Sequence, residues 1–385
     1  MTVTLKRLGD IATYVNGYAF KPTDWKNKGL PIIRIQNLTN PDSPFNYYQG
    51  EIDDKYIVNK GDILISWSAS LGVFEWLGEK AVLNQHIFKV IFDKEDIDKS
   101  YFKYIVQRSL ERALKYLHGS TMKHITKKYF DNILVPIPDL VTQKKIAKVL
   151  DKAQELIDKR KAQIEALDQL TQSVFLEMFG DPIKNTNQYK KEKLANLCIK
   201  ITDGTHHSPP TVKEGIPYIT AKHLNKGGLD FFKDPTYVSL EDHQKIYERC
   251  NPEKGDVLYI KDGATTGIAA INHYDFEFSM LSSLALIKVD FNKLNNYYLT
   301  HFLNNERVFR KITSGMNGGA IKRLTLKKIN NIEVVVPPIE LQNQFAEIIK
   351  KIEIQKELLQ KSLEELENNF NSLMQRVFKG ELFND

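Results

Sequence analysis

Basic side chains gather twice in this sequence, each time just after a segment rich in small residues. The groups are Lys123, His124, Lys127 and Lys128 in the first half, and Lys322, Arg323, Lys327 and Lys328 in the second. Gly, Ser and Asn in the preceding segments let backbone N–H groups approach a phosphate, which the cationic side chains also attract. A run of charge is usually a solvated surface. The duplication nevertheless favours contact with a DNA backbone.

A second set of side chains carries hydrogen-bonding groups that suit base edges. They lie in the stretches where the two halves of the chain differ. The candidates are Arg34, Gln36, Asn84, Gln85 and His86 in the first half, and His206, His207, Lys222, His223 and Lys261 in the second. Arg and Lys match the acceptors of guanine, and Asn and Gln match adenine. A surface or core role remains the alternative for each residue.

Signatures of catalysis are missing from the sequence. There is no Gly-x-x-x-x-Gly-Lys-Ser/Thr loop, no Gly-x-Gly-x-x-Gly turn and no Asn-Pro-Pro-aromatic tetrapeptide of amino-methyltransferases. Asp42, Asp53 and Lys55 loosely fit a nuclease cluster, but the second half has no counterpart, so we interpret them as coincidence. His206 and His207 have no further ligand at a metal-type spacing, which predicts no metal site.

An internal repeat organises the chain. The stretch from Met122 to Pro138 aligns without a gap with the stretch from Ile321 to Pro337, 199 residues later. The same offset relates Gln143 to Gln342, where both copies enter a long helical pattern. A repeat of this length outranks any short motif as a guide to the fold.

Each long helix has an apolar stripe with heptad spacing, which is typical of a coiled coil. The stripe residues are Ile157, Ile164, Leu167, Val174 and Met178 in the first copy, and Leu359, Leu363, Leu366, Phe370, Leu373 and Val377 in the second. Gly180 and Gly380 mark the helix ends. We expect the two helices to pair with each other. The alternative is that each helix packs only on its own globular half.

The rest of each half reads as short strands joined by turns, with one helix near its end. Gly29–Ile35, Lys60–Ser66 and His86–Phe92 are expected strands, and their equivalents in the second half are Gly215–Ala221, Lys254–Ile260 and Leu284–Val289. One helical face carries Tyr298, Phe302, Phe309 and Ile312, which predicts a single helix there. The fold class is therefore α+β, because the crossovers are mostly too short for a doubly wound parallel sheet.

This pattern predicts four segments. They are a globular domain over residues 1–138, a central helix over 139–180, a second globular domain over 181–337 and a C-terminal helix over 338–385. The 385 residues carry a net charge of +6, which fits a polyanionic partner. Two cysteines are too few for a disulfide framework, and no stretch reads as a signal peptide or a membrane span. We therefore expect a cytoplasmic protein with no membrane partner.

The order of these motifs resembles the specificity (S) subunits of Type I restriction–modification systems. The resemblance rests on Asp203-Gly-Thr-His-His, Gly215-Ile-Pro-Tyr-Ile, Lys254-Gly-Asp-Val-Leu and the repeated Ile-x-Val-Pro-x-Pro entry to a long helix. It covers essentially the whole chain. In the first half Asn16-Gly-Tyr-Ala-Phe stands where the second half has Asp-Gly-Thr-His, so the two halves differ at this loop.

The resemblance implies two target-recognition domains that each read one half of a split, asymmetric site in double-stranded DNA. It implies an antiparallel coiled coil that sets the distance between the half-sites. It also implies two methyltransferase (M) subunits, which bring S-adenosylmethionine, and restriction (R) subunits, which bring ATP and magnesium. The chain itself would then hold no cofactor and catalyse nothing. The alternative is a single-chain DNA nuclease or methyltransferase with its own recognition domains.

Overall fold

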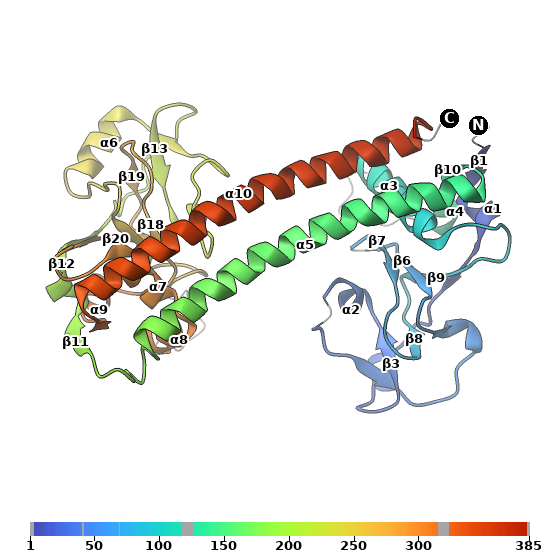
Figure 1. Cartoon of the computed structure of the whole chain (residues 1–385), viewed down its shortest axis with the longest axis horizontal. Helices are drawn as coiled ribbons and strands as arrows, with labels where there is room; N and C mark the ends of the chain where they lie inside the picture. The colour runs from blue at the N-terminus through green and yellow to red at the C-terminus, as the bar shows by residue number, and fades with distance from the viewer. Residues whose placement is uncertain (1–3, 41, 69, 117–125, 315–322, 383–385) are drawn as a thin grey trace. The chain divides into compact units, whose positions relative to one another are not determined.

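A computed structural model describes residues 4–40, 42–68, 70–116, 126–314 and 323–382. The chain divides into two compact units (Figure 1). Unit 1 comprises Met1–Lys161 with Lys361–Asp385, and unit 2 comprises Ala162–Gln360. Among the described residues, no helix combines the length and the hydropathy that crossing a bilayer requires.

Unit 1 contains two four-stranded sheets. The first is antiparallel, in the order β2 (Thr13–Asn16), β9 (Ile87–Ile91), β6 (Ile63–Ser66) and β7 (Gly72–Glu75). The second has the order β4 (Asn46–Tyr48), β3 (Leu30–Ile33), β8 (Ala81–Leu83) and β5 (Ile57–Val58), with β3 and β8 parallel. A further pair joins β1 (Thr4–Arg7) to β10 (Leu134–Ile137). The helices are α1 (Leu8–Ile11), α2 (Ile35–Thr39), α3 (Lys99–Tyr116) and α4 (Lys127–Asp131).

Unit 2 repeats this plan. Its antiparallel sheet has the order β12 (Cys198–Asp203), β20 (Leu284–Val289), β17 (Val257–Ile260) and β18 (Ala269–Ile271). Its second sheet has the order β16 (Tyr237–Val238), β13 (Ile216–Ile219) and β19 (Ser279–Met280), with β13 and β19 parallel. Two further pairs are β14 (Leu224–Asn225) with β15 (Gly228–Leu229), and β11 (Lys190–Lys193) with β21 (Glu333–Val336). The helices are α6 (Leu240–Tyr247), α7 (Asn296–Asn304), α8 (Glu306–Thr313) and α9 (Leu326–Asn330). The predicted α+β class and repeat are therefore confirmed.

The prediction of a single helix near the end of the second half is wrong. The segment that carries Tyr298 and Ile312 forms two helices, α7 and α8, with a break at Asn305. The Asn305 side chain accepts hydrogen bonds from the N–H groups of Arg307 and Val308, so it caps the start of α8. Such capping satisfies N–H groups that a new helix would otherwise leave unpaired, and it lets the chain change direction while both pieces keep an apolar face.

The two long helices are α5 (Leu140–Phe179) and α10 (Ile339–Phe378), of 40 residues each. α5 ends directly before Gly180 and α10 ends two residues before Gly380, and both glycines have positive φ (+73° and +68°). Every residue of the predicted apolar stripe is buried or half-buried. Glycine is favoured at these helix ends because the residue there adopts a left-handed conformation. Glycine has no Cβ, so it adopts this conformation at little steric cost.

Within each unit, α5 and α10 run antiparallel to each other (Figure 1). In unit 1 the first turns of α5 share a core with the last turns of α10, through Ile146 and Leu150 on one side and Met374 on the other. In unit 2 the end of α5 shares a core with the start of α10, through Phe179 and Phe345. The predicted pairing of the helices is confirmed, and their ends also enter the cores of the sheets and helices beside them.

A buried glutamine joins each long helix to its domain. Gln143 accepts a hydrogen bond from the Asp98 N–H (2.9 Å) and donates one to the Pro138 carbonyl (2.8 Å). Its repeat partner Gln342 accepts from the Asn295 N–H (2.9 Å) and donates to the Pro337 carbonyl (2.8 Å). Because Asp98 and Asn295 directly precede α3 and α7, each amide ties three segments of its domain together.

The apolar stripe yields a test of the helix pairing. Ile157 is 3% exposed, whereas its neighbour Leu156 is 44% exposed. We expect Ile157→Asp to lower the free energy of unfolding by about 3–5 kcal/mol, because it leaves an unpaired charge buried. Leu156→Asp is the matched control and should change it by about 0.5 kcal/mol or less. Thermal melts followed by circular dichroism measure both, and equal melting temperatures would contradict the assignment of the stripe.

Candidate nucleic-acid interface

The candidate base-reading segments of unit 1 meet at one corner, which backbone hydrogen bonds hold together. The end of β2 joins the segment between β8 and β9, where the Tyr18 N–H donates to the Leu83 carbonyl (2.8 Å). The Gln85 N–H returns a hydrogen bond to the Tyr18 carbonyl (2.9 Å). Trp67, which directly follows β6, donates its N–H to the His86 carbonyl (3.3 Å).

Unit 2 builds the same corner with equivalent hydrogen bonds. Thr205 donates its N–H to the Met280 carbonyl (2.8 Å), and Ser282 donates to the Thr205 carbonyl (2.8 Å). Lys261, which directly follows β17, donates its N–H to the Ser283 carbonyl (2.9 Å). The two units therefore share one backbone framework at this place, and we call it the corner of each unit.

A glycine lies at the tightest point of each corner. A Cβ added to Gly17 would lie 2.1 Å from the carbonyl oxygen of Asn84, and one added to Gly204 would lie 2.0 Å from that of Met280. Real Cβ atoms essentially never approach backbone this closely. The Asn-Gly and Asp-Gly dipeptides of the sequence are therefore needed for close approach between segments.

The side chains at equivalent positions of the two corners differ in chemistry. In unit 1 the Trp67 indole Nε1 donates to Asn16 Oδ1 (3.3 Å), which is a contact between neutral groups. In unit 2 the equivalent positions hold Lys261 and Asp203, whose Nζ and Oδ2 atoms form an ion pair at 3.5 Å. The backbone is thus common to both corners, while the surfaces that they present are distinct.

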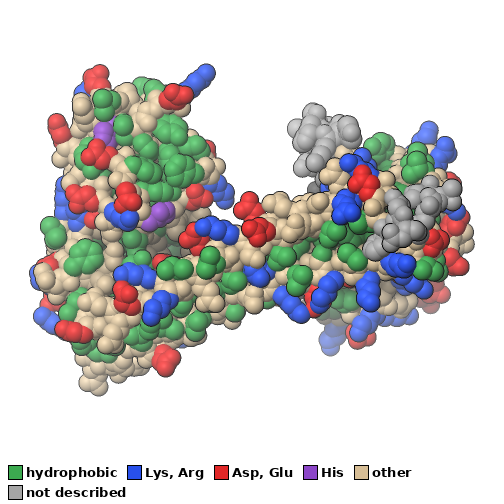
Figure 2. Space-filling model, turned by 45° about the horizontal axis from the view of Figure 1, so that its top comes forward, with side chains coloured by type: hydrophobic (Ala, Val, Ile, Leu, Met, Phe, Trp, Pro, Cys, Tyr) green, Lys and Arg blue, Asp and Glu red, His purple; other side chains and the backbone are tan. Residues whose placement is uncertain are grey.

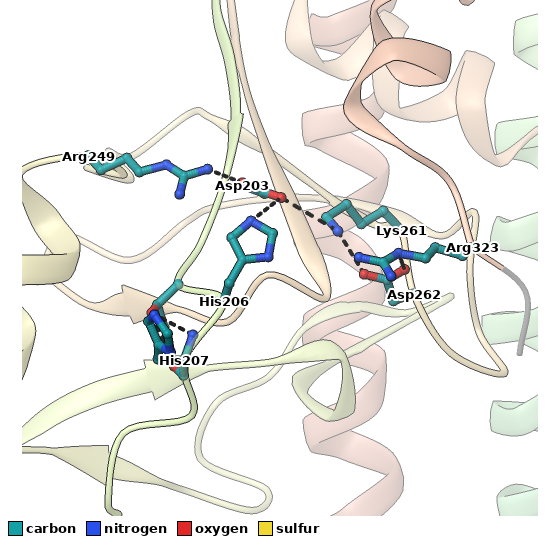
Figure 3. A network of polar contacts seen from close by, with 8 residues as sticks. Asp203, His206, His207, Arg249, Lys261, Asp262 and Arg323 are labelled. Carbon is teal, nitrogen blue, oxygen red and sulfur yellow. Dashed lines mark hydrogen bonds and ion pairs between the residues drawn. The ribbon is translucent and has the colours of Figure 1, made fainter.

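Asp203 and Asp262 organise a network of ion pairs at the corner of unit 2 (Figure 3). Asp203 is buried, and its Oδ1 accepts from Arg249 Nη2 (2.6 Å) while its Oδ2 lies 3.2 Å from His206 Nε2. Lys261 Nζ lies 2.7 Å from Asp262 Oδ2.

The same network reaches the second basic group of the sequence. Arg323 Nε lies 3.0 Å from Asp262 Oδ1, and the Leu324 N–H donates to the Lys261 carbonyl (2.7 Å). The side chains of Arg249, His206 and Arg323 are about half-exposed or more, whereas that of Lys261 is buried. The exposed Arg249, His206 and Arg323 side chains therefore lie against carboxylates that are largely shielded from water.

In unit 1 the predicted base readers lie at or beside the corner. Arg34 precedes α2, and its guanidinium lies over the Trp25 ring at 5.5 Å. Gln36 is exposed on α2. Asn84 and Gln85 are half-buried, and His86 adopts φ +72° with its ring 4.9 Å from that of Trp67.

In unit 2 the structure separates the predicted base readers. His206 and His207 are exposed, and Lys222 is exposed in an ion pair with Asp234 (2.9 Å). His223 was expected to face DNA, and that expectation is wrong for the folded chain. Its ring is buried, which lowers its pKa, and Nδ1 accepts a hydrogen bond from the Thr220 N–H (3.0 Å).

The predicted phosphate contacts are placed only in part. Lys123, His124 and Lys322 lie outside the described residues. Lys127 and Lys128 are exposed on α4, which Thr126 caps, and Lys327 and Lys328 are exposed on α9, which Thr325 caps. On the face drawn in Figure 2, Lys and Arg side chains lie among Asp and Glu side chains rather than in one continuous patch.

Sequence reasoning missed Asn16, Trp67 and Arg249. Asn16 and Trp67 were detectable as the repeat partners of Asp203 and Lys261. Arg249 carries no local signal, because it contacts Asp203 across 46 residues of sequence.

The structure buries the Cys250 thiol and half-buries the Cys198 thiol. Burial raises the pKa of both Cys198 and Cys250 to about 12, so these thiols are poor nucleophiles at neutral pH. Within the ranges that the structure describes, no group of three or more His, Cys, Asp or Glu residues is placed to hold a metal ion.

Solved structures share this architecture. The S subunit of a Type-I restriction-modification system from M. genitalium superposes with a TM-score of 0.57 at 16% identity, covering 98% of this chain and 96% of that chain. A chain from a study of complex assembly and conformational transition of the type I R-M system gives 0.56 at 18% identity, covering 99% and 98%. The fold is thus the one seen in S subunits.

Sequence comparison assigns the family. The family model of the Type I restriction modification DNA specificity domain matches residues 2–167 and 188–368. The Type I restriction enzyme EcoBI specificity subunit of Escherichia coli is 24% identical over 97% of this chain and 85% of its own length. The MjaVIII specificity subunit of Methanocaldococcus jannaschii is 22% identical over 98% and 92%. The chain belongs to the family of Type I restriction–modification specificity subunits, a membership that implies recognition of DNA sequence.

The close approach at the corner can be tested by adding one methyl group. We expect Gly204→Ala to lower the free energy of unfolding by about 1–3 kcal/mol or more, because the backbone of Met280 must move to admit a Cβ. Gly227→Ala is the control, since its nearest neighbour is the flexible side chain of Asn225 at 3.0 Å. Urea denaturation compares them, and equal stability of the two variants would refute the steric argument.

Proposed function

We propose that this chain is the non-catalytic subunit that reads a bipartite, asymmetric DNA target within a Type I restriction–modification complex. The observation that supports this proposal is that the corner occurs twice. The two corners have equivalent backbone hydrogen bonds but different side chains. Base edges are read by side chains, whereas a scaffold only places them. Two equal scaffolds with different side chains suit two different half-sites.

The basic residues support a separate role at the DNA backbone. Lys128 and Lys327 occupy equivalent positions on α4 and α9, two residues after the Thr caps, and Lys127 and Lys328 lie beside them. Phosphate contacts fix the position of a protein on DNA without carrying sequence information. We assign the same role to Lys123, His124, Lys322 and Arg323. Base reading is assigned to the corners, where the two units differ.

We further propose that two M subunits dock on this chain and that R subunits join that core. Apolar side chains exposed on the long helices support a protein partner, namely Val149, Leu156 and Leu170 on α5 and Ile354 and Leu358 on α10. Exposed apolar side chains that recur along one helix favour burial by another chain. S-adenosylmethionine, ATP and magnesium would act on those subunits, and this chain would supply DNA recognition.

An exchange of domains tests the two-reader proposal. Residues 1–138 would be replaced by the equivalent domain of a relative with another target. We expect the new complex to methylate a site in which one half is changed and the other is kept, because well-separated sites rarely couple. Mapping of methylated adenines in host DNA measures this. A target that changed in both halves would contradict the proposal.

The helix pair is proposed to set the spacer between the half-sites. Insertion of one helical turn before Ile157 should shift one reader by roughly 5 Å along the helix. DNA rises about 3.4 Å per base pair, so the preferred spacer should grow by one or two base pairs with unchanged half-sites. Methylation of a ladder of spacer lengths measures the optimum.

An insertion of equal length between Lys226 and Gly227 is the control, since it lies in the β14–β15 hairpin, outside both helices. This control insertion should leave the preferred spacer length unchanged. An active helix-insertion mutant with an unchanged optimum would refute the role of the helices as a spacer.

A further inference from the structure

Unit 2 buries a lysine at the position where unit 1 places a tryptophan. Lys261 is 2% exposed and is paired with the carboxylates of Asp203 and Asp262. Removing charges from water is costly, and an apolar replacement of a buried ion pair is often neutral or stabilising. A buried charge network therefore needs a reason other than stability.

The molecule contains its own comparison. The corner of unit 1 closes with equivalent backbone hydrogen bonds around the neutral contact between Asn16 and Trp67. This framework thus forms without a buried lysine or aspartate. The charged residues at the corner of unit 2 therefore change the surface that this corner presents, and the fold does not require them.

What the charged corner presents is an oriented arginine. The Arg249 side chain is 55% exposed, yet its Nη2 donates at 2.6 Å to an Asp203 carboxylate that is 3% exposed. A guanidinium is a planar fork, so fixing one of its N–H groups also fixes the directions of the others. An arginine held in this way loses less conformational freedom when it binds a second acceptor.

We propose that Arg249 reads a guanine in the half-site of unit 2, and that Lys261 is a positioning residue that holds Asp203 in place for it. The inference rests on the proposed function and deepens it. Guanine presents the N7 and O6 acceptors in the major groove, and a bidentate arginine is their commonest partner. Reading a base needs fixed donor directions, which the buried carboxylate supplies.

Arg323 provides a contrast within the same network. It pairs with Asp262, whose side chain is 23% exposed, and it belongs to the basic group assigned to phosphate. A phosphate contact carries no base information. The two arginines should therefore respond differently to the same substitution.

The experiment uses the full chain in a complex reconstituted with M subunits. The probe is a duplex DNA library randomised over both half-sites. We expect Arg249→Gln to reduce the preference for guanine at one position of one half-site by roughly 10- to 100-fold. The other half-site should be selected as by the wild type.

Two further variants calibrate this result. Arg310→Gln removes the same charge from an arginine whose partner Glu306 is 75% exposed, and it should select the wild-type target. Arg323→Gln should weaken binding to all sequences and lower the salt slope by about one. If Arg249→Gln behaved like either of them, the assignment of Arg249 as a base reader would be overturned.

Lys261 is tested in two ways, because its loss leaves Asp203 without its buried cation. Lys261→Met should relax the same guanine position while the M subunits stay bound. The double variant Asp203→Asn, Lys261→Trp installs the pair that unit 1 already accommodates, so it should fold, and it should lose the same preference. A folded double variant that kept the preference would overturn the positioning role. A wild-type complex that selected no sequence would instead overturn the proposed function itself.

Discussion

A buried amide at the first turn of each long helix is the constraint on which the rest of the chain depends. In both Gln143 and Gln342 the amide oxygen accepts a hydrogen bond from the N–H of the residue before α3 or α7. The amide nitrogen donates a hydrogen bond to a proline carbonyl. Leaving any of these buried groups unpaired would cost about 1–3 kcal/mol. Apolar packing alone resists sliding weakly, whereas hydrogen bonds are directional. The first turn of each long helix is therefore fixed to the segments of its own domain that these hydrogen bonds join.

The repeat and the helices could be predicted from the sequence because their signals are local and occur twice. The apolar stripe, the glycine ends and the duplicated entry to α5 and α10 all appear in the structure. The break at Asn305 could not be predicted in this way. Asn is not a helix breaker, and the residues on both sides of it keep an apolar face. Its effect comes from a capping geometry that only the folded chain displays.

The region of the candidate site could be predicted from the sequence, but the roles of its individual residues could be predicted less well. Lys261 was chosen as a base reader, but its side chain is buried and pairs with Asp203, which is distant in sequence, so its burial could not be foreseen. His223 was chosen for its chemistry, yet it occupies the position where Asn37 of unit 1 caps α2 by accepting the Arg34 N–H. A comparison of the two halves at equivalent backbone positions would have identified that shared role.

The division between backbone and side chain explains how one scaffold presents two surfaces. The corner closes through N–H and carbonyl groups, which every residue except proline supplies in full. Side-chain identity is fixed chiefly where space forbids a Cβ, at Gly17 and Gly204. At the remaining positions the side chains can change without loss of the hydrogen bonds that hold the segments together. A neutral indole–amide contact and a buried ion network can therefore occupy the same corner.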